Sequence, residues 1–226
     1  MKTPIRNLIT RESLVATASY NTRWFARLIA GSAVLGTSAL ASNWDGDVSN
    51  DWNDNNNWAG NVANTGNAVV NVNSLTAPPF FPVISANSTQ TLVDLFVGFG
   101  AGANGRLDHT AGTAATGGGN WMEVGNNGGT GVYNLADTAA SGGTFTGFGT
   151  GSGNMNVNGR LYVGGSQAGG RDAAGGNGTV RVNTTGTLAI NGDLNVGVRN
   201  NVGVVSIATG TVTTNGWNFF GRESGI

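Results

Sequence analysis

Leu161-Tyr162-Val163-Gly164 and Leu194-Asn195-Val196-Gly197 are two copies of one motif, in which a short apolar segment ends at a glycine. We call the copies of this motif the anchors, and they occupy residues 95–98, 122–125, 161–164, 194–197 and 218–221. Their glycines are separated by 27, 39, 33 and 24 residues. An imperfect period of this length is typical of proteins that stack one structural repeat on the next.

The segments between anchors contain short alternating strands that begin at a glycine. One example is Gly178-Thr179-Val180-Arg181-Val182, and Gly186-Thr187-Leu188-Ala189-Ile190 follows it before the next anchor. Alternation places the apolar side chains on one face of a strand, but so short a strand cannot bury that face alone. Equivalent strands from successive repeats can stack into one apolar column. We therefore expect each repeat to form one coil of about three short strands, with the anchor glycine where the chain bends closely past its neighbour.

The pattern predicts an all-β fold, and more specifically a β-solenoid of short stacked strands with an irregular N-terminal cap. Residues 95–226 are expected to form the glycine-rich repeats. They end in what resembles the opening of another repeat, so the array is expected to be truncated at the C-terminus. The alternative is a β-sandwich, in which antiparallel strands are joined by glycine-rich hairpins.

Residues 1–41 have the organisation of a signal peptide. Five basic residues and one acidic residue are followed by an apolar run over 28–39, and Ala39-Leu40-Ala41 supplies an A-x-A cleavage site. The run is shorter than the about 20 residues that a membrane span needs. We therefore predict export through a cleaved signal, with no membrane insertion of the mature part. The alternative is an uncleaved anchor helix.

Residues 42–94 differ in composition from the repeats. Trp44, Trp52 and Trp58 lie in a run rich in Asp and Asn, and the prolines at 78, 79 and 82 lie in the same segment. A solenoid has an open apolar end that must be covered, and large aromatic side chains on irregular backbone suit that task. This segment is predicted to be the N-terminal cap. The alternative is that the three tryptophans face outward and stack on sugar rings.

Charge and cysteine content exclude several classes of function. Residues 1–41 hold five of the 11 basic and one of the 12 acidic residues, so residues 42–226 carry six basic and 11 acidic residues, a net charge of −5. This acidic, lysine-free part argues against binding to nucleic acid, which requires clustered positive charge. The chain has no cysteine, which excludes thiol catalysis, iron–sulfur clusters and zinc–thiolate sites.

The opening of residues 42–94 and the anchors together resemble a known group of proteins. Asn43-Trp44-Asp45-Gly46, Asp51-Trp52-Asn53 and Asn57-Trp58, with the two anchors quoted first, are similar to segments of exported bacterial repeat proteins. These include autotransporter passengers and surface proteins with a PEP-CTERM sorting tail. The resemblance implies a secreted or surface-attached β-solenoid of unassigned activity, and it supplies no catalytic residues. The chain departs from the group in having neither a sorting tail nor a membrane barrel.

Candidate chemistry in the sequence is sparse. His109 follows Asp108, but two sequence neighbours do not make a catalytic triad, and we expect a polar residue at a turn. The carboxylates at 45, 47, 51 and 54 are spaced as at the start of a calcium loop, yet Asn50 and Asn56 replace the glycine and glutamate that such a loop requires. The sequence therefore assigns no catalytic, cofactor-binding or metal-binding residue, and no cofactor.

These observations predict a secreted or cell-surface structural or adhesive protein that is not an enzyme. Its expected partners are extracellular glycans or other cell-surface components; the sequence does not decide its oligomeric state. The alternative is a carbohydrate-binding or polysaccharide-degrading β-helix, suggested by Trp121, Tyr162 and Trp217 as candidate exposed aromatic residues. Hydrolysis would need two carboxylates flanking the scissile bond, and no such pair is evident in the sequence.

Overall fold

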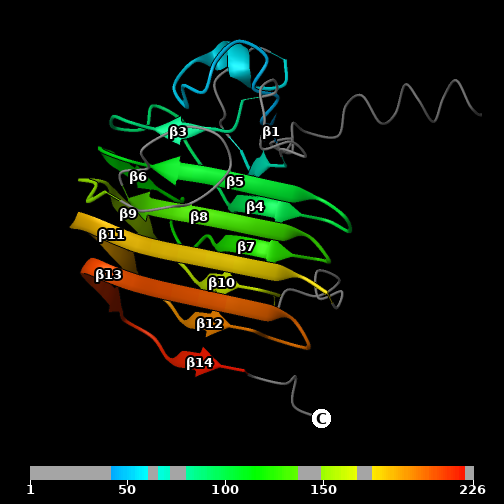
Figure 1. The fold of residues 1–226 in the computed structure, drawn as a ribbon, viewed down its shortest axis with the longest axis vertical. Helices are drawn as coiled ribbons and strands as arrows, with labels where there is room; N and C mark the ends of the chain where they lie inside the picture. Colours follow the sequence, from blue (N-terminus) through cyan, green and yellow to red (C-terminus); the bar gives the residue numbers. More distant parts are fainter. Residues whose placement is uncertain (1–41, 61–65, 72–79, 137–148, 167–174, 222–226) are drawn as a thin grey trace, which may run out of the picture. The chain divides into compact units, whose positions relative to one another are not determined.

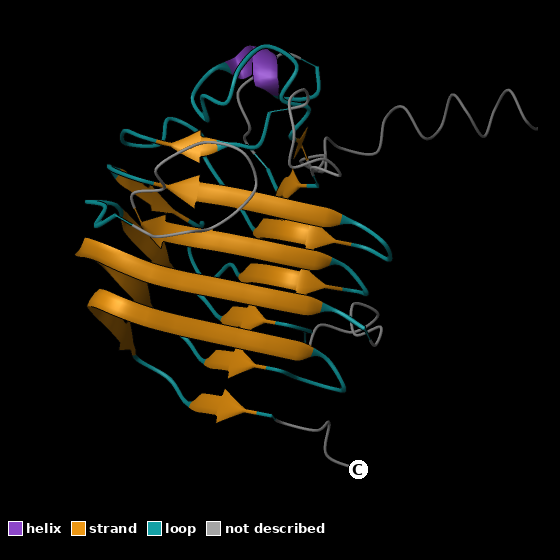
Figure 2. Cartoon of the chain, viewed as in Figure 1, coloured by secondary structure: helices purple, strands orange, loops and turns teal. Residues whose placement is uncertain are grey.

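The computed structural model describes residues 42–60, 66–71, 80–136, 149–166 and 175–221, which belong to one compact unit, Ala39–Ile226 (Figure 1). The predicted signal peptide, residues 1–41, lies outside the described residues. The described part is all-β, with fourteen strands and one short 3-10 helix, η1 (Asn55–Asn57) (Figure 2). Across these residues, no helix is both long and apolar enough to cross a bilayer.

Seven of the described strands form a parallel sheet, which we call sheet 1. Across the sheet they are β1 (Ser42–Asn43), β2 (Ala68–Val70), β4 (Leu95–Phe99), β7 (Met122–Asn126), β10 (Leu161–Val163), β12 (Leu194–Val196) and β14 (Asn218–Phe220). Their order in space follows their order in the sequence, so each excursion of the chain returns one strand further along the sheet (Figure 1). β1 and β2 show that this ladder begins within residues 42–94, before the first anchor.

The anchors lie on β4, β7, β10, β12 and β14 in matching register. Two files of core residues run through the first four of them: Leu95, Met122, Leu161, Leu194, and two positions later Val97, Val124, Val163, Val196. Every member of both files is at most 7% exposed and belongs to the single core cluster. The prediction that the anchors stack on one another is confirmed.

A second parallel sheet, sheet 2, supplies the other wall of the core. Its strands are β3 (Val83–Ile84), β5 (Asn104–His109), β6 (Thr113–Ala115), β8 (Thr130–Ala136), β9 (Asn154–Val157), β11 (Asn177–Ile190) and β13 (Val202–Thr214). β11 pairs with β8 along its first half and with β9 along its second half. Two strands of sheet 2, β5 and β6, follow β4, and β8 and β9 follow β7, whereas β11 and β13 are single continuous strands.

The connections between the strands of sheet 2 differ in length. Residues 137–153 separate β8 from β9, while β11 passes the equivalent corner as one strand with local register shifts after Val182. All pairings between the named strands of the described part are parallel, and the antiparallel contact is an isolated bridge between Trp44 and Trp58. The antiparallel hairpins of the alternative β-sandwich are not found in the described residues.

Each anchor glycine adopts a left-handed backbone conformation, with φ between 64° and 70°. A Cβ atom on Gly125 would lie 1.9 Å from the carbonyl oxygen of Asn177 in the next coil. Gly98 and Gly164 make the same close approach to Thr130 and Val202. The expectation that the anchor glycine marks a close approach between coils is confirmed at these three positions.

The N-terminal end of the core is closed by three tryptophans. Trp44, Trp52 and Trp58 are at most 4% exposed, with ring centroids 4.7 to 6.2 Å apart. Each indole N–H donates a hydrogen bond: to the Phe80 carbonyl, to the Ser88 hydroxyl and to the Trp52 carbonyl, respectively. Because the rings are buried, the alternative in which they face outward to stack on sugars is wrong. Their burial at the end of the stack is what a cap requires, so the cap remains our prediction for this segment.

Side-chain amides form a ladder at one corner of the coils. The Asn215 amide donates to the Asn191 carbonyl oxygen at 3.1 Å, and Asn191 donates in the same way to Asn158 at 3.0 Å. Asn158 in turn donates to the backbone carbonyl of Thr116. Such a ladder links equivalent corners of four successive coils and adds to the backbone hydrogen bonds between them.

Candidate functional site

The outer face of sheet 1 carries two rows of polar and aromatic side chains. Alternation along each strand directs one residue of each anchor away from the core. These residues form the strand row: Phe96, Glu123, Tyr162, Asn195 and Phe219. The residues just before each strand form the entry row: Asp94, Trp121, Arg160, Asp193 and Trp217. Backbone hydrogen bonds keep the entry row in register. The N–H of the first residue of each strand donates to the backbone carbonyl of the entry-row residue that precedes the neighbouring strand.

The entry row is held together by carboxylates. The Asp94 carboxylate accepts the Trp121 backbone N–H at 2.7 Å, and Asp193 accepts the Trp217 N–H at 2.9 Å. The other oxygen of Asp193 pairs with the Arg160 guanidinium at 3.1 Å. The Arg160 and Asp193 side chains are 46% and 20% exposed, and Trp217 is 75% exposed. This row therefore presents aromatic rings and one ion pair to solvent.

The polar members of the strand row, Glu123, Tyr162 and Asn195, are buried. Glu123 is fully buried; one carboxylate oxygen accepts the Ser166 hydroxyl at 2.8 Å, and the other accepts the Asn126 amide. Tyr162, also fully buried, packs edge-on against the Trp121 ring, with centroids 6.0 Å apart. Burial raises the pKa of Tyr162, and the nearby Arg160 guanidinium partly opposes that rise.

Asn195 is the unusual member of the strand row. It is 1% exposed, and neither its amide nitrogen nor its amide oxygen has a hydrogen-bond partner among the described residues. A buried polar group without a partner costs about 1–3 kcal/mol, and almost all such groups in folded proteins are satisfied by protein or water. This amide therefore keeps the capacity to donate to and accept from one further polar group, such as a buried water molecule.

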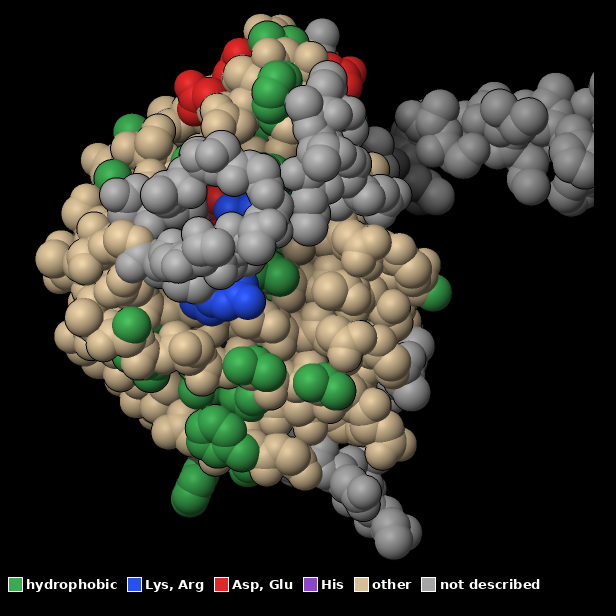
Figure 3. Space-filling model, in the orientation of Figure 1, with side chains coloured by type: hydrophobic (Ala, Val, Ile, Leu, Met, Phe, Trp, Pro, Cys, Tyr) green, Lys and Arg blue, Asp and Glu red, His purple; other side chains and the backbone are tan. Residues whose placement is uncertain are grey.

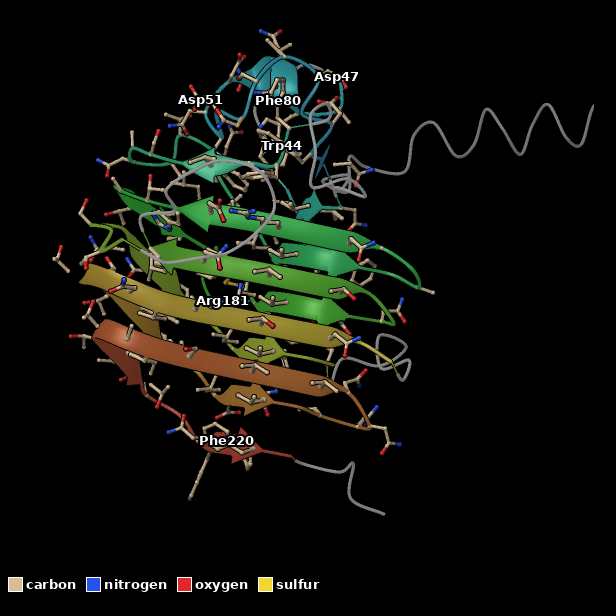
Figure 4. All side chains as sticks on the ribbon, in the orientation of Figure 1. Trp44, Asp47, Asp51, Phe80, Arg181 and Phe220 are labelled. Carbon is tan, nitrogen blue, oxygen red and sulfur yellow. The ribbon has the colours of Figure 1, made fainter. Side chains whose placement is uncertain are left out.

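Sheet 2 carries a separate ionic cluster on its outer face. The Arg106 guanidinium pairs with both carboxylate oxygens of Asp108, at 2.7 and 3.0 Å, and the Asn134 amide donates to Asp108 at 2.6 Å. The same guanidinium lies 4.1 Å from the centre of the Phe81 ring. Arg181, labelled in Figure 4, donates to Asn134, and burial followed by the charge of Arg106 lowers its pKa.

His109 lies on the opposite face of β5 from Asp108, inside the core. Its Nδ1 lies 2.9 Å from the Tyr133 hydroxyl and its Nε2 lies 3.1 Å from the Gly112 carbonyl. Because a carbonyl only accepts, Nε2 carries the proton and the Tyr133 hydroxyl donates to Nδ1. The expectation of a polar residue at a turn is wrong, since alternation in β5 directs His109 inward.

Burial lowers the pKa of His109 from 6.5 to about 4. Between these values the unfolded chain binds a proton that the folded chain does not, so the free energy of unfolding should fall as the pH drops from 6.5 to 4. The contribution of His109 to this fall is up to about 3 kcal/mol. Urea unfolding at several pH values should show a shallower dependence in His109→Gln than in the unsubstituted chain. Equal slopes in the two proteins would contradict the prediction.

The acidic side chains at 45, 47, 51 and 54 do not form a calcium loop. Asp51 and Asp54 accept backbone N–H groups of their own turns, from Asn53 and Asn56, both at 2.9 Å. Asp47 and Asp51 lie on opposite sides of this segment (Figure 4). Within the described residues, no group of three or more His, Cys, Asp or Glu side chains is placed to hold a metal ion.

Of the aromatic residues suggested by the sequence, Trp217 is exposed, Trp121 is half-buried and Tyr162 is buried. The strand row itself was missed, although aligning the anchors by their glycines would have shown one outward position per anchor. Comparison of the chain with protein-family models, with curated proteins and with solved structures finds no significant match to any of them.

Proposed function

We propose that this chain is a secreted or cell-surface β-solenoid with a structural and adhesive role and no catalytic activity. The observation that carries the proposal is the in-register stacking of the anchors, in which each coil repeats the core positions of the one before. In such an array the free energy of folding accumulates coil by coil, so a long, stable spacer forms without disulfides. The acidic, small-polar composition suits a surface that stays solvated.

The extracellular location rests on the sequence of residues 1–41, whose basic start, apolar run and A-x-A site favour export. The resemblance to exported bacterial repeat proteins supports the same location. The absence of cysteine is compatible with it, because the core and the inter-coil hydrogen bonds replace disulfides as the source of stability.

A second candidate function, non-catalytic carbohydrate binding, is favoured by the outer face of sheet 1. Trp121 and Trp217 lie three strands apart, about 14 Å, with the Arg160–Asp193 pair between them. Indole rings pack against the C–H faces of sugars, and amides and ion pairs bond to their hydroxyls. The entry-row carboxylates Asp94 and Asp193 are also about 14 Å apart. That separation exceeds the roughly 5 to 9.5 Å that glycosidases use, so binding is favoured over degradation.

One adhesion experiment tests both candidates. Beads coated with the full chain are expected to be retained on target cell surfaces. If glycans mediate this retention, a glycan panel should bind the chain, and Trp121→Ala/Trp217→Ala should weaken binding by about tenfold or more. Val48→Ala, which truncates an exposed residue elsewhere, is the matched control. If beads that carry the Trp121→Ala/Trp217→Ala chain are still retained on cell surfaces, adhesion does not require the entry row. If beads that carry the unsubstituted chain are retained on no cell surface, the adhesive role is wrong.

A further inference from the structure

Asparagine followed directly by glycine occurs six times in the chain, at residues 104–105, 127–128, 158–159, 177–178, 191–192 and 215–216. All six pairs lie in the described residues. Asparagine is a labile residue, and a glycine after it adds to this lability, because the glycine nitrogen can attack the side-chain amide carbon without hindrance from a Cβ. The attack requires a side-chain amide that is free to turn and a peptide plane that is free to rotate. The fold therefore decides which of the six pairs react.

Two of the pairs are fixed in strands. Asn104 and Asn177 are the first residues of β5 and β11, and the glycines after them both pair in parallel register with Gly131 of β8. The fit between coils is close here, since a Cβ on Gly105 would lie 2.2 Å from the backbone nitrogen of Gly98. Rotation of either peptide plane would break the ladder, so these two pairs are held in an unreactive extended form.

Three further pairs contribute to the amide ladder at the corner of the coils. The side-chain amides of Asn158, Asn191 and Asn215 are all engaged in hydrogen bonds of that ladder. The backbone N–H groups that follow Asn191 and Asn215 also donate to carbonyl groups of the preceding coil, at 2.8 and 3.1 Å. The ladder therefore keeps these amides from turning toward the attacking nitrogens.

Asn127 and Gly128 differ from the other five pairs. They are the central residues of the turn between β7 and β8, with φ of 53° and 80°. The N–H of Gly129 donates to the Asn126 carbonyl at 3.0 Å, so the four residues form a type I′ turn. Both central residues are partly exposed. Among the described residues, neither the Asn127 side-chain amide nor the Gly128 N–H has a hydrogen-bond partner.

The fold does not require an Asn-Gly pair at this corner. A type I′ turn favours Asn-Gly because both central residues need a positive φ. The equivalent turn between β12 and β13 uses Arg199 and Asn200 instead, with φ of 55° and 61°. The reactive pair can therefore be removed from the β7–β8 turn by a residue that the chain already uses in the same conformation.

Rotation of one peptide plane makes the β7–β8 turn reactive. Turning the plane between Asn127 and Gly128 converts a type I′ turn into a type II′ turn, in which the first central residue keeps its positive φ. Glycine at the second position accepts the accompanying change in φ without strain. The turns that join the two sheets follow one another along the right-hand side of the view in Figure 1, and Figure 3 shows mainly uncharged polar side chains and backbone there. This neutral surface does not repel the hydroxide ion that must remove the amide proton of the glycine.

We propose that Asn127 is a self-modification site, at which the chain converts this asparagine to isoaspartate and aspartate without an enzyme. Hydroxide removes the Gly128 amide proton, and the nitrogen forms a bond to the side-chain amide carbon of Asn127. The bond from that carbon to the side-chain nitrogen breaks, and ammonia leaves with a proton from water. Water then opens the resulting cyclic imide at either of its two carbonyl carbons, which gives aspartate or isoaspartate. The net reaction consumes water and releases ammonia, with no oxidation or reduction.

The products change the contact between neighbouring turns. Isoaspartate carries the backbone through its side chain, so it lengthens the turn by one atom, and both products add a carboxylate. The Gly128 carbonyl accepts the N–H of Gly102 from the β4–β5 turn at 3.3 Å, and a longer turn displaces this acceptor. Modification is therefore expected to loosen this corner and to add negative charge to it. The inference rests on the geometry of the turn and does not depend on the proposed adhesive role.

The test follows each asparagine in the full, folded chain during incubation in mildly alkaline buffer. Fragment masses from a peptide digest locate the replacement of the amide NH2 by OH, and an isoaspartyl methyltransferase labels the isoaspartate product. Asn127 should convert at least about tenfold faster than each of the other five asparagines. In the chain unfolded in urea, where neither turn nor ladder remains, the six should convert at rates similar to one another.

Two matched substitutions complete the test. Asn127→Arg introduces the residue type that Arg199 supplies in the equivalent turn, and it should remove most of the ammonia that the folded chain releases. Asn177→Arg makes the same change at an exposed asparagine whose pair is fixed in a strand, and it should leave the release unchanged. The proposal is overturned if Asn127 stays intact in the folded chain, if the other pairs convert equally fast there, or if Asn127 alone converts in the unfolded chain.

Discussion

Substitution of Gly125 by alanine is expected to lower the free energy of unfolding by about 4 kcal/mol or more, an effect in the exceptional range for one substitution. Two causes add. Its φ of 67° costs any residue with a Cβ about 1–2 kcal/mol. The added Cβ would also lie 1.9 Å from the Asn177 carbonyl oxygen and 2.5 Å from the Gly178 nitrogen, so the two coils must separate. That separation breaks core contacts on both sides.

Gly221 is the matched control for this prediction. It is the equivalent glycine of the last anchor, with φ of 64°, but a Cβ there meets no atom of the described residues within 4 Å. Gly221→Ala should therefore cost only the backbone term of about 1–2 kcal/mol. Urea unfolding followed by tryptophan fluorescence measures both variants, since the buried indoles report the state of the core. Equal losses in the two variants would show that the close approach between coils contributes nothing.

Substitution of Asp108 by asparagine is expected to cost about 3–5 kcal/mol. Asp108 is 1% exposed and its carboxylate holds the Arg106 guanidinium through two hydrogen bonds. Asparagine keeps the size of the side chain but removes its charge, so the buried Arg106 guanidinium loses its ion pair with Asp108. Arg181 nearby adds to the cost, because its charge is no longer balanced by Asp108.

Two further variants separate this explanation from a general loss of packing. Asp193→Asn removes one partner of the exposed Arg160–Asp193 pair and should cost no more than about 1 kcal/mol. The double variant Arg106→Met/Asp108→Leu removes both buried charges and should recover most of the stability that Asp108→Asn loses. Chemical denaturation of the three variants gives the comparison. A double variant that is less stable than Asp108→Asn would contradict the account.

The candidate site shows why sequence analysis found some functional positions and missed others. Trp217 could be named from the sequence because an aromatic residue in a glycine-rich corner has few places to be buried. Tyr162, in contrast, lies in the strand row on β10 and is fully buried, a fact that no local pattern encodes. Arg106 and Asp108 are two residues apart on an alternating strand, so their shared face was predictable, but the contact of Arg106 with the distant Phe81 ring was not.

The sequence by itself determined the strand-forming segments, the recurrence of the anchors, their common register and the need for glycine at the bends, because side-chain alternation and backbone conformation are local properties. The tertiary structure alone decided which of these strands fuse into one, which tryptophans become buried, and that His109 faces the core. Those outcomes depend on contacts between residues that are distant in the sequence. The burial of a side chain, its pKa and the pairing of a strand are set by these contacts and not by the local sequence.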